Sequence, residues 1–147
     1  MARSALSLKG RALRHLAARE HSRAELEHKL AAHEEESGQL RRVLDELQSK
    51  GFISEQRVIE SVIHRRAAKL GTARVAQDLR RMGLDEAALG DALVQMRATE
   101  VDRAREVWRK KFGAPATDAA ERARQMRFLA SRGFAPEAIY RVMRDDD

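Results

Sequence analysis

The stretch Leu79-Arg-Arg-Met-Gly-Leu-Asp-Glu-Ala-Ala-Leu89-Gly-Asp-Ala-Leu93 decides the fold, because the spacing of its three leucines recurs on either side of it. The other two occurrences are Leu30, Leu40 and Leu44, and Leu129, Ile139 and Met143, so that corresponding positions lie 49 and 50 residues apart. A period near 50 residues indicates units too small to bury their own apolar faces, which stack to form one continuous core. We therefore predict three tandem repeats over residues 1–53, 54–98 and 99–147, the last ending in a short acidic tail.

Each repeat is expected to contain three helices. Apolar residues recur at i, i+3 and i+4, no run alternates as a strand would, and the chain has only two prolines. The pattern predicts an all-α, elongated array that can be curved, with helices over residues 5–19, 22–33, 38–50, 54–70, 72–82, 85–97, 99–112, 118–132 and 136–144.

Residues with strong cap preferences mark the ends of these helices. Helix C-terminal glycines are expected at positions 51, 71, 83, 113 and 133. N-caps are expected at Ser22 (with Glu25 in a capping box), Ser54, Thr72, Asp85 and Asp118. Residues 34–38 form either a loop or a helical extension. Arg66 lies in the apolar stripe of its helix, so it either pairs with a carboxylate between repeats or extends its side chain along the edge of the core to reach solvent.

Composition narrows the class of protein. Hydrophobic residues make up 43% of the chain and charged residues 35%, as expected for small helices with large solvated faces. The absence of cysteine excludes disulfides and thiolate metal sites. No apolar run approaches the ~18 residues that a membrane span needs, so we expect a cytoplasmic protein with no membrane partner.

The formal net charge of +6 is unevenly distributed. Residues 57–82 carry 7 basic and 2 acidic side chains, and residues 99–134 carry 9 and 5. An anionic partner would be attracted most strongly there. We predict a basic ridge that binds a partner protein or DNA, although an ordinary solvated face is the alternative for any one of its members: Arg65, Lys69, Arg74, Arg80, Arg81, Arg105, Arg109, Lys110, Arg124 and Arg127.

Catalytic and metal sites find little support. The chain has no glycine-rich phosphate loop and no Gly-x-Ser-x-Gly motif. The spacing of His21, His28 and His33 does not suit a metal, so surface histidines are expected, with no catalytic residue and no cofactor. Residues 74–96 resemble a helix-turn-helix, but their second helix is acidic and phosphates would repel it.

The few aromatic side chains are interpreted as packing residues rather than platforms for stacking bases. They are Trp108, Phe112, Phe134 and Tyr140.

Several motifs together carry a family resemblance. They are Ser22-Arg-Ala-Glu-Leu-Glu-His-Lys-Leu30, Lys50-Gly-Phe-Ile-Ser54, Lys69-Leu-Gly-Thr-Ala-Arg-Val-Ala-Gln-Asp-Leu-Arg-Arg-Met-Gly-Leu84, Lys110-Lys-Phe-Gly113 and Phe128-Leu-Ala-Ser-Arg-Gly-Phe134. In order and spacing they resemble the RecX family of recombinase regulators over about residues 6–143.

The resemblance implies three three-helix repeats and a non-enzymatic regulator that binds the RecA recombinase and its filament on single-stranded DNA. We expect the protein to be a monomer. Such a regulator mainly restrains filament growth, strand exchange and co-protease activity in recombination, DNA repair and the SOS response. Two alternatives stay open on the residues alone: a sequence-nonspecific DNA binder, and a structural or adaptor array.

Overall fold

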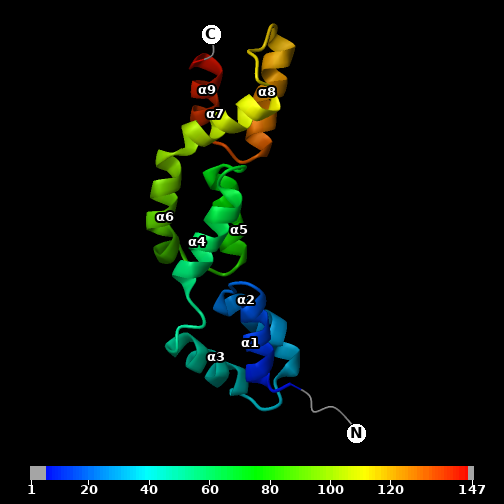
Figure 1. Ribbon diagram of the computed structural model, residues 1–147, viewed down its shortest axis with the longest axis vertical. Coiled ribbons are helices and arrows are strands. Elements are labelled where there is room, and N and C mark those ends of the chain that lie inside the picture. The colour runs from blue at the N-terminus through cyan, green and yellow to red at the C-terminus, as the bar shows by residue number, and fades with distance from the viewer. Residues whose placement is uncertain (1–5, 146–147) are drawn as a thin grey trace.

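The protein is an elongated stack of three three-helix repeats, seen in a computed structural model that describes residues 6–145, with side chains to residue 144. The two ends of the chain lie at opposite ends of the stack (Figure 1). Within residues 6–145 the helices are α1 Leu8–Ala18, α2 Arg23–Leu30, the 3₁₀ helix η1 Ala31–His33, α3 Gln39–Ser49, α4 Glu55–Arg66, α5 Thr72–Arg81, α6 Glu86–Ala98, α7 Glu100–Lys111, α8 Ala119–Ser131 and α9 Pro136–Asp145. The prediction of an all-α fold of three tandem repeats is therefore confirmed.

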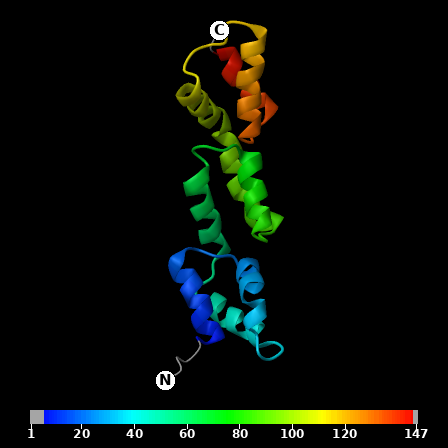
Figure 2. The same ribbon diagram turned by 90° about the vertical axis from the view of Figure 1, so that its right-hand side faces the viewer.

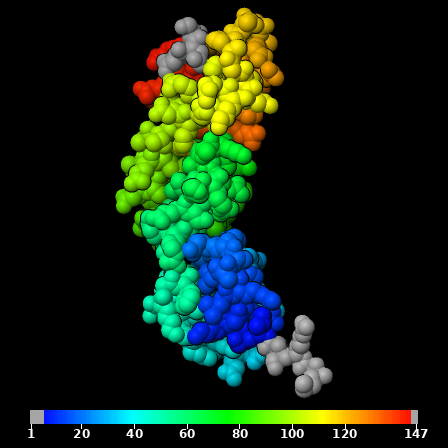
Figure 3. Space-filling model, viewed as in Figure 1, coloured from blue at the N-terminus to red at the C-terminus, as the bar shows by residue number. Residues whose placement is uncertain are grey.

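The repeats follow one another along the long axis in both views (Figures 1 and 2). Helices α1–α3 form the first repeat, α4–α6 the second and α7–α9 the third. In the space-filling view the side chains of successive repeats meet end to end along the stack (Figure 3). A long surface is thus exposed relative to the small interior.

The leucine skeleton predicts the interior correctly, since all nine of its members are buried. One prediction about that interior is wrong. The buried apolar residues form three separate clusters, one in each repeat, rather than one continuous core. Three helices close around each skeleton, and the contacts between repeats include hydrogen bonds from backbone and polar groups.

The helix ends follow local chemistry in most cases. Ser22 and Glu25 form the predicted capping box, and Ser54, Asp85 and Asp118 cap α4, α6 and α8 as expected. Residues 34–38 are a loop, in which Glu34 Oε2 accepts a hydrogen bond from the Leu40 backbone N–H at 2.8 Å. A carboxylate at the start of α3 also suits the positive end of that helix.

Two cap predictions at the start of α5 are wrong. Four of the five glycines expected at helix C-termini have a positive φ, but Gly71 has a φ of −74° and is itself the N-cap of α5, one residue before Thr72. Gly71 is needed for a close approach, because a Cβ there would lie 2.2 Å from the carbonyl oxygen of Gly133. The Gly71 N–H also donates to the Arg132 carbonyl at 2.8 Å, so this position joins the second and third repeats.

Arg103 of α7 organises the same junction. Its guanidinium donates to the carbonyl oxygens of Ala67, Leu70 and Met96 at 2.8, 2.6 and 2.8 Å, and to the hydroxyls of Thr72 and Thr99 at 3.1 and 3.2 Å. These five bonds use all the donor hydrogens of an arginine side chain. Helix α4 ends at Arg66, short of the predicted residue 70, and two of the carbonyls that follow it are bound by Arg103.

Candidate interaction surfaces

The predicted basic side chains do lie on the outside of the protein. Nine of the ten are exposed and Arg105 is half-buried. Five have a carboxylate on the same or the next helix within ion-pair distance, which offsets part of their charge. The pairs are Arg80 with Glu86 at 2.6 Å, Arg105 with Asp102 at 3.4 Å, Arg109 and Lys110 with Glu106 at 2.6 and 3.7 Å, and Arg124 with Glu121 at 2.9 Å.

The arginine partners hold the pKa of the Glu86, Glu106 and Glu121 carboxyls below its ordinary value, chiefly through hydrogen bonds from Arg80, Arg109 and Arg124. These carboxylates therefore stay charged at neutral pH. The other five predicted residues make no ion pair within residues 6–144 and supply the uncompensated positive charge. They are Arg65, Lys69, Arg74, Arg81 and Arg127.

The structure divides the predicted ridge between faces. Arg80 and Arg81 are adjacent on α5 but point into different grooves, since successive residues of a helix are about 100° apart around its axis. Arg80 and Arg105 line one groove, and Arg65 and Arg81 line another. Four other members lie on α7 and α8 of the third repeat, where the Arg124 guanidinium stacks over the Phe112 ring with its carbon 5.4 Å from the ring centre: Arg109, Lys110, Arg124 and Arg127.

The groove that holds Arg65 and Arg81 spans the first and second repeats. It has a volume of about 290 Å³ and is also lined by Arg19, Arg66, Glu25 and Asp78. Arg19 pairs with Glu25 at 2.7 Å, and Arg66 Nη1 lies 3.2 Å from Asp78 Oδ2 without hydrogen-bond geometry. Arg66 thus pairs with a carboxylate of its own repeat. The predicted alternative of an ion pair between repeats is wrong. Arg65 and Arg81 remain for an external anion, and we name this hollow the Arg65 groove.

The second groove lies between the second and third repeats and was not predicted. It consists of two adjoining hollows of about 440 and 590 Å³, which share Arg97, Val101 and Arg141 as lining residues. Arg80 lines the first hollow, and Arg105 and Arg144 line the second. We name the whole the Arg97 groove. The arginines of this groove come from four helices, and Arg97, Arg141 and Arg144 are not members of the predicted ridge. Spacing along one helix therefore could not reveal the groove.

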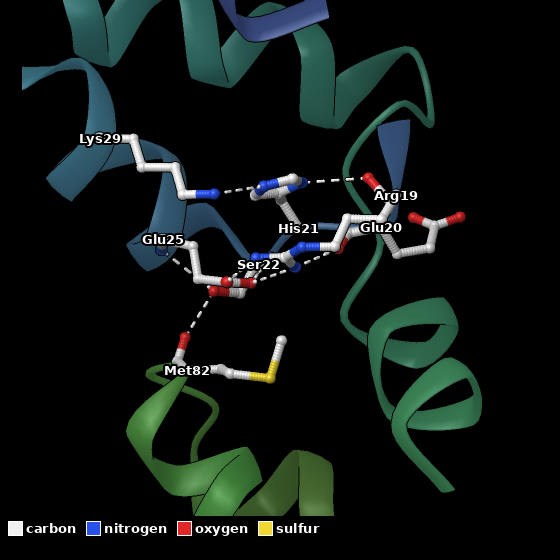
Figure 4. Close-up of polar contacts among 7 residues, drawn as sticks. All are labelled: Arg19, Glu20, His21, Ser22, Glu25, Lys29 and Met82. Carbon is white, nitrogen blue, oxygen red and sulfur yellow. Dashed lines mark hydrogen bonds and ion pairs between the residues drawn. The ribbon is translucent and has the colours of Figure 1, made fainter. Parts of the chain in front are cut away.

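Between the first and second repeats a polar cluster forms the junction (Figure 4). The Ser22 hydroxyl donates to the carbonyl oxygen of Met82, and Arg57 Nε donates to Glu20 Oε1 at 2.9 Å. The backbones are close here as well, because a Cβ on Gly83 would lie 2.4 Å from the Cβ of Ala24. The first repeat is therefore attached to the second by specific contacts.

His21 belongs to this cluster, and its prediction as a surface residue is wrong, since only 2% of it is exposed. Its ring lies between the Arg19 carbonyl, 3.0 Å from Nδ1, and Lys29 Nζ, 2.8 Å from Nε2 (Figure 4). A carbonyl only accepts and an ammonium only donates, so the neutral ring carries its proton on Nδ1. Burial, together with the charges of Arg19 and Lys29, lowers the pKa of His21.

The aromatic residues divide into two groups. Trp108 and Phe134 are buried in the third repeat and Phe112 packs against the same cluster, as predicted. The Trp108 indole N–H donates to Gln125 Oε1 at 2.8 Å, which satisfies its one polar group. Tyr140 differs from the prediction of a packing residue, because 61% of it is exposed on the outer side of α9.

The described part of the chain offers neither a metal cluster nor a membrane-spanning helix. Among those residues no group of three or more histidine, aspartate or glutamate side chains could hold a metal ion. None of the described helices is both long enough and apolar enough to cross a bilayer.

Comparison with known proteins identifies the family. Residues 9–47 match the model of the first three-helix domain of RecX, and residues 98–143 match that of its third three-helix domain. The regulatory protein RecX of Leptothrix cholodnii is 54% identical over 142 residues, which cover 97% of this chain and 90% of the relative. The chain belongs to the RecX family.

Other RecX proteins extend the similarity over almost the whole chain. The regulatory protein RecX of Ralstonia nicotianae is 46% identical over 145 residues, covering 99% of this chain and 91% of the relative. The crystal structure of RecX from Lactobacillus salivarius superposes with a TM-score of 0.79 at 17% identity and covers 94% of this chain and 93% of that one. The first comparison supports a RecX regulatory role and the second supports the fold.

Proposed function

We propose that this RecX-family chain binds the RecA recombinase and its nucleoprotein filament and mainly inhibits filament growth, strand exchange and co-protease activity. It would act by occupancy, without turnover, as a cytoplasmic monomer whose units are residues 1–53, 54–98 and 99–147. The observation that carries the proposal is the close similarity to RecX regulatory proteins over nearly the whole chain. The long stack supports it, because a stack of small repeats presents an extended surface to a macromolecular partner.

The charge distribution suggests how the surface is used. Exposed ion pairs over α7 and α8 leave both acidic and basic groups available for contact with protein. The uncompensated Arg65 and Arg81, with the exposed Arg74 seven residues before Arg81 on α5 as a further candidate contact, supply charge for single-stranded DNA or for an acidic part of the recombinase. Contacts of this kind would give weak direct DNA binding that salt reduces.

The test is the DNA-dependent ATPase of the cognate recombinase with increasing, substoichiometric amounts of this protein. Inhibition well below one molecule per recombinase, without comparable affinity for bare DNA, is expected. The double variant Arg65→Gln with Arg81→Gln should inhibit less than the matched variant Arg14→Gln with Arg41→Gln. Arg14 and Arg41 are also exposed and, within residues 6–144, also lack an ion pair, so both variants lose the same two charges.

Two other outcomes would replace the proposal. Inhibition that begins only when the DNA is saturated would make the protein a sequence-nonspecific DNA binder, whose affinity falls steeply with salt. No effect on the recombinase and no DNA binding would favour an adaptor array.

A further inference from the structure

The Arg97 groove concentrates positive charge where the second and third repeats meet. Its outer hollow is lined by Arg97 from α6, Arg105 from α7, and Arg141 and Arg144 from α9, and Asp102 is the one carboxylate among its lining residues within 6–144. Asp102 lies 3.4 Å from Arg105. Within residues 6–144 the side chains of Arg97, Arg141 and Arg144 make no ion pair, and all three are exposed. Three like charges gathered without a counter-ion favour an anionic ligand.

Small apolar side chains line the groove beside its charged residues. Val101 lines both hollows, Ala98 lines the outer one, and Ala76 and Ala138 line the inner one. These side chains are small, so they leave room for apolar side chains of a ligand. A groove with an apolar lining and a few convergent charged groups is typical of a binding site.

A phosphate backbone suits this groove poorly. Among the described residues no aromatic side chain lines either hollow, so bases would have nothing on which to stack. Glu100 and Glu137 line the inner hollow together with Arg80, Arg97 and Arg141, and these carboxylates would repel a continuous chain of phosphates. A peptide can instead place carboxylates at the arginines and apolar side chains over the alanines and Val101.

We propose that the Arg97 groove is a docking site for an acidic peptide segment of a partner protein, in which apolar side chains alternate with carboxylates. The arginine guanidinium is well suited to this role, because its fork of donors binds a carboxylate through two parallel hydrogen bonds. The inference goes beyond the proposed function and does not depend on it, since it concerns the chemistry of the ligand alone.

The experiment measures fluorescence anisotropy of a labelled eight-residue peptide of alternating glutamate and leucine, titrated with the full-length protein. The Arg97→Gln, Arg141→Gln variant is expected to bind about tenfold more weakly, the size for two solvent-accessible charge contacts. The matched Arg14→Gln, Arg41→Gln variant, with the same loss of charge, should bind within about twofold of the unmodified protein. All four positions are exposed, so unchanged circular dichroism and melting temperature would verify that the variants fold.

Two further probes distinguish the kinds of ligand. A peptide of alternating glutamate and serine, with the same charge, should bind several-fold more weakly, because it cannot cover the apolar side chains of the groove. Equal binding of the two peptides, or equal losses in the two variants, would overturn the proposal and leave a general electrostatic surface. An eight-nucleotide single strand that binds more tightly than the leucine peptide and depends on Arg97 and Arg141 would also overturn it in favour of nucleic acid.

Discussion

Replacing Arg103 by methionine should destabilise the protein more than any change to the exposed arginines. The guanidinium lies beside the C-termini of α4 and α6, where it binds the carbonyls of Ala67, Leu70 and Met96. Cations are stabilising at helix C-termini, where carbonyl groups lack partners within the helix. Methionine has a similar length but no donor, so three carbonyls and two threonine hydroxyls would each lose a hydrogen bond.

The expected magnitude follows from opposing effects. A hydrogen bond to a charged group contributes roughly 1.5–3 kcal/mol, and five such bonds would give an overestimate because the half-buried guanidinium also has a desolvation cost. Burial lowers the pKa of Arg103, which reflects the same desolvation cost. We therefore expect Arg103→Met to reduce the free energy of unfolding by about 3 kcal/mol, or a melting temperature lower by roughly 6–12 °C.

The assay is urea unfolding followed by both circular dichroism and the fluorescence of Trp108. Arg103→Lys should lose about 1–2 kcal/mol, because lysine keeps the charge but has three donors and no fork. Arg127→Met is the control, since Arg127 is exposed and makes no ion pair among residues 6–144, and it should stay within about 0.5 kcal/mol of the unmodified protein. An Arg103→Met variant as stable as this control would refute the role assigned to Arg103.

Three more changes test the remaining contacts. Gly133→Ala should lower the free energy of unfolding by about 2 kcal/mol or more, because φ is +89° and the new Cβ would lie 2.4 Å from the Cβ of Arg74. Gly90→Ala should instead raise the free energy of unfolding by about 0.5–1 kcal/mol, because Gly90 lies inside α6 with open space around it. Urea titration compares the two variants. Hydrogen bonds from Lys50 and Lys9 lower the pKa of Glu46 to about 2. The contribution of Glu46 to stability is therefore present above pH 4.5 and is lost as the pH falls toward 2. Acid unfolding of Glu46→Gln should not show this loss. Burial lowers the pKa of His21 below 6.5, so on acidification from pH 6.5 the unfolded state binds the proton first and the free energy of unfolding falls. His21→Gln should flatten the dependence of the free energy of unfolding on pH between about 6.5 and 5. An unchanged dependence would contradict the burial of the neutral ring.

The fold could be predicted because its signals are local. Ser22 and Glu25 form a capping box from residues three apart, and the spacing of Leu79, Leu89 and Leu93 places all three on the inside of one repeat. Helix starts and buried positions of this kind depend on neighbours within a few turns.

The contacts between repeats could not be predicted in the same way. Nothing in the periodicity separates Arg103, which binds five acceptors, from the exposed Arg109 six residues further along α7. His21 was expected at the surface because the spacing of the histidines does not suit a metal, yet its buried ring lies against the His15 ring of α1 and Lys29 of α2. The Arg97 groove likewise depends on four helices meeting, which spacing along one helix does not encode.

The repeat period nevertheless extends to the junctions, where residues 50 positions apart meet equivalent partners. Ala24 faces Gly83 at the first junction, and Arg74 faces Gly133 at the second. Arg103 and Glu100 have no such counterparts, since the residues 50 positions earlier are Ile53 and Lys50.

The second junction consequently has additional polar contacts. The buried Glu100 carboxylate accepts the Thr72 N–H at 2.8 Å at the start of α5, while Arg103 binds the ends of α4 and α6. These contacts hold α5 and α6 against α7, and those three helices contribute most of the Arg97 groove. A groove fixed by its own junction binds a ligand without first having to be ordered, which reduces the entropic cost of association. The extra contacts at this junction, and their absence from the first, thus give a structural reason why a docking groove would lie between the second and third repeats.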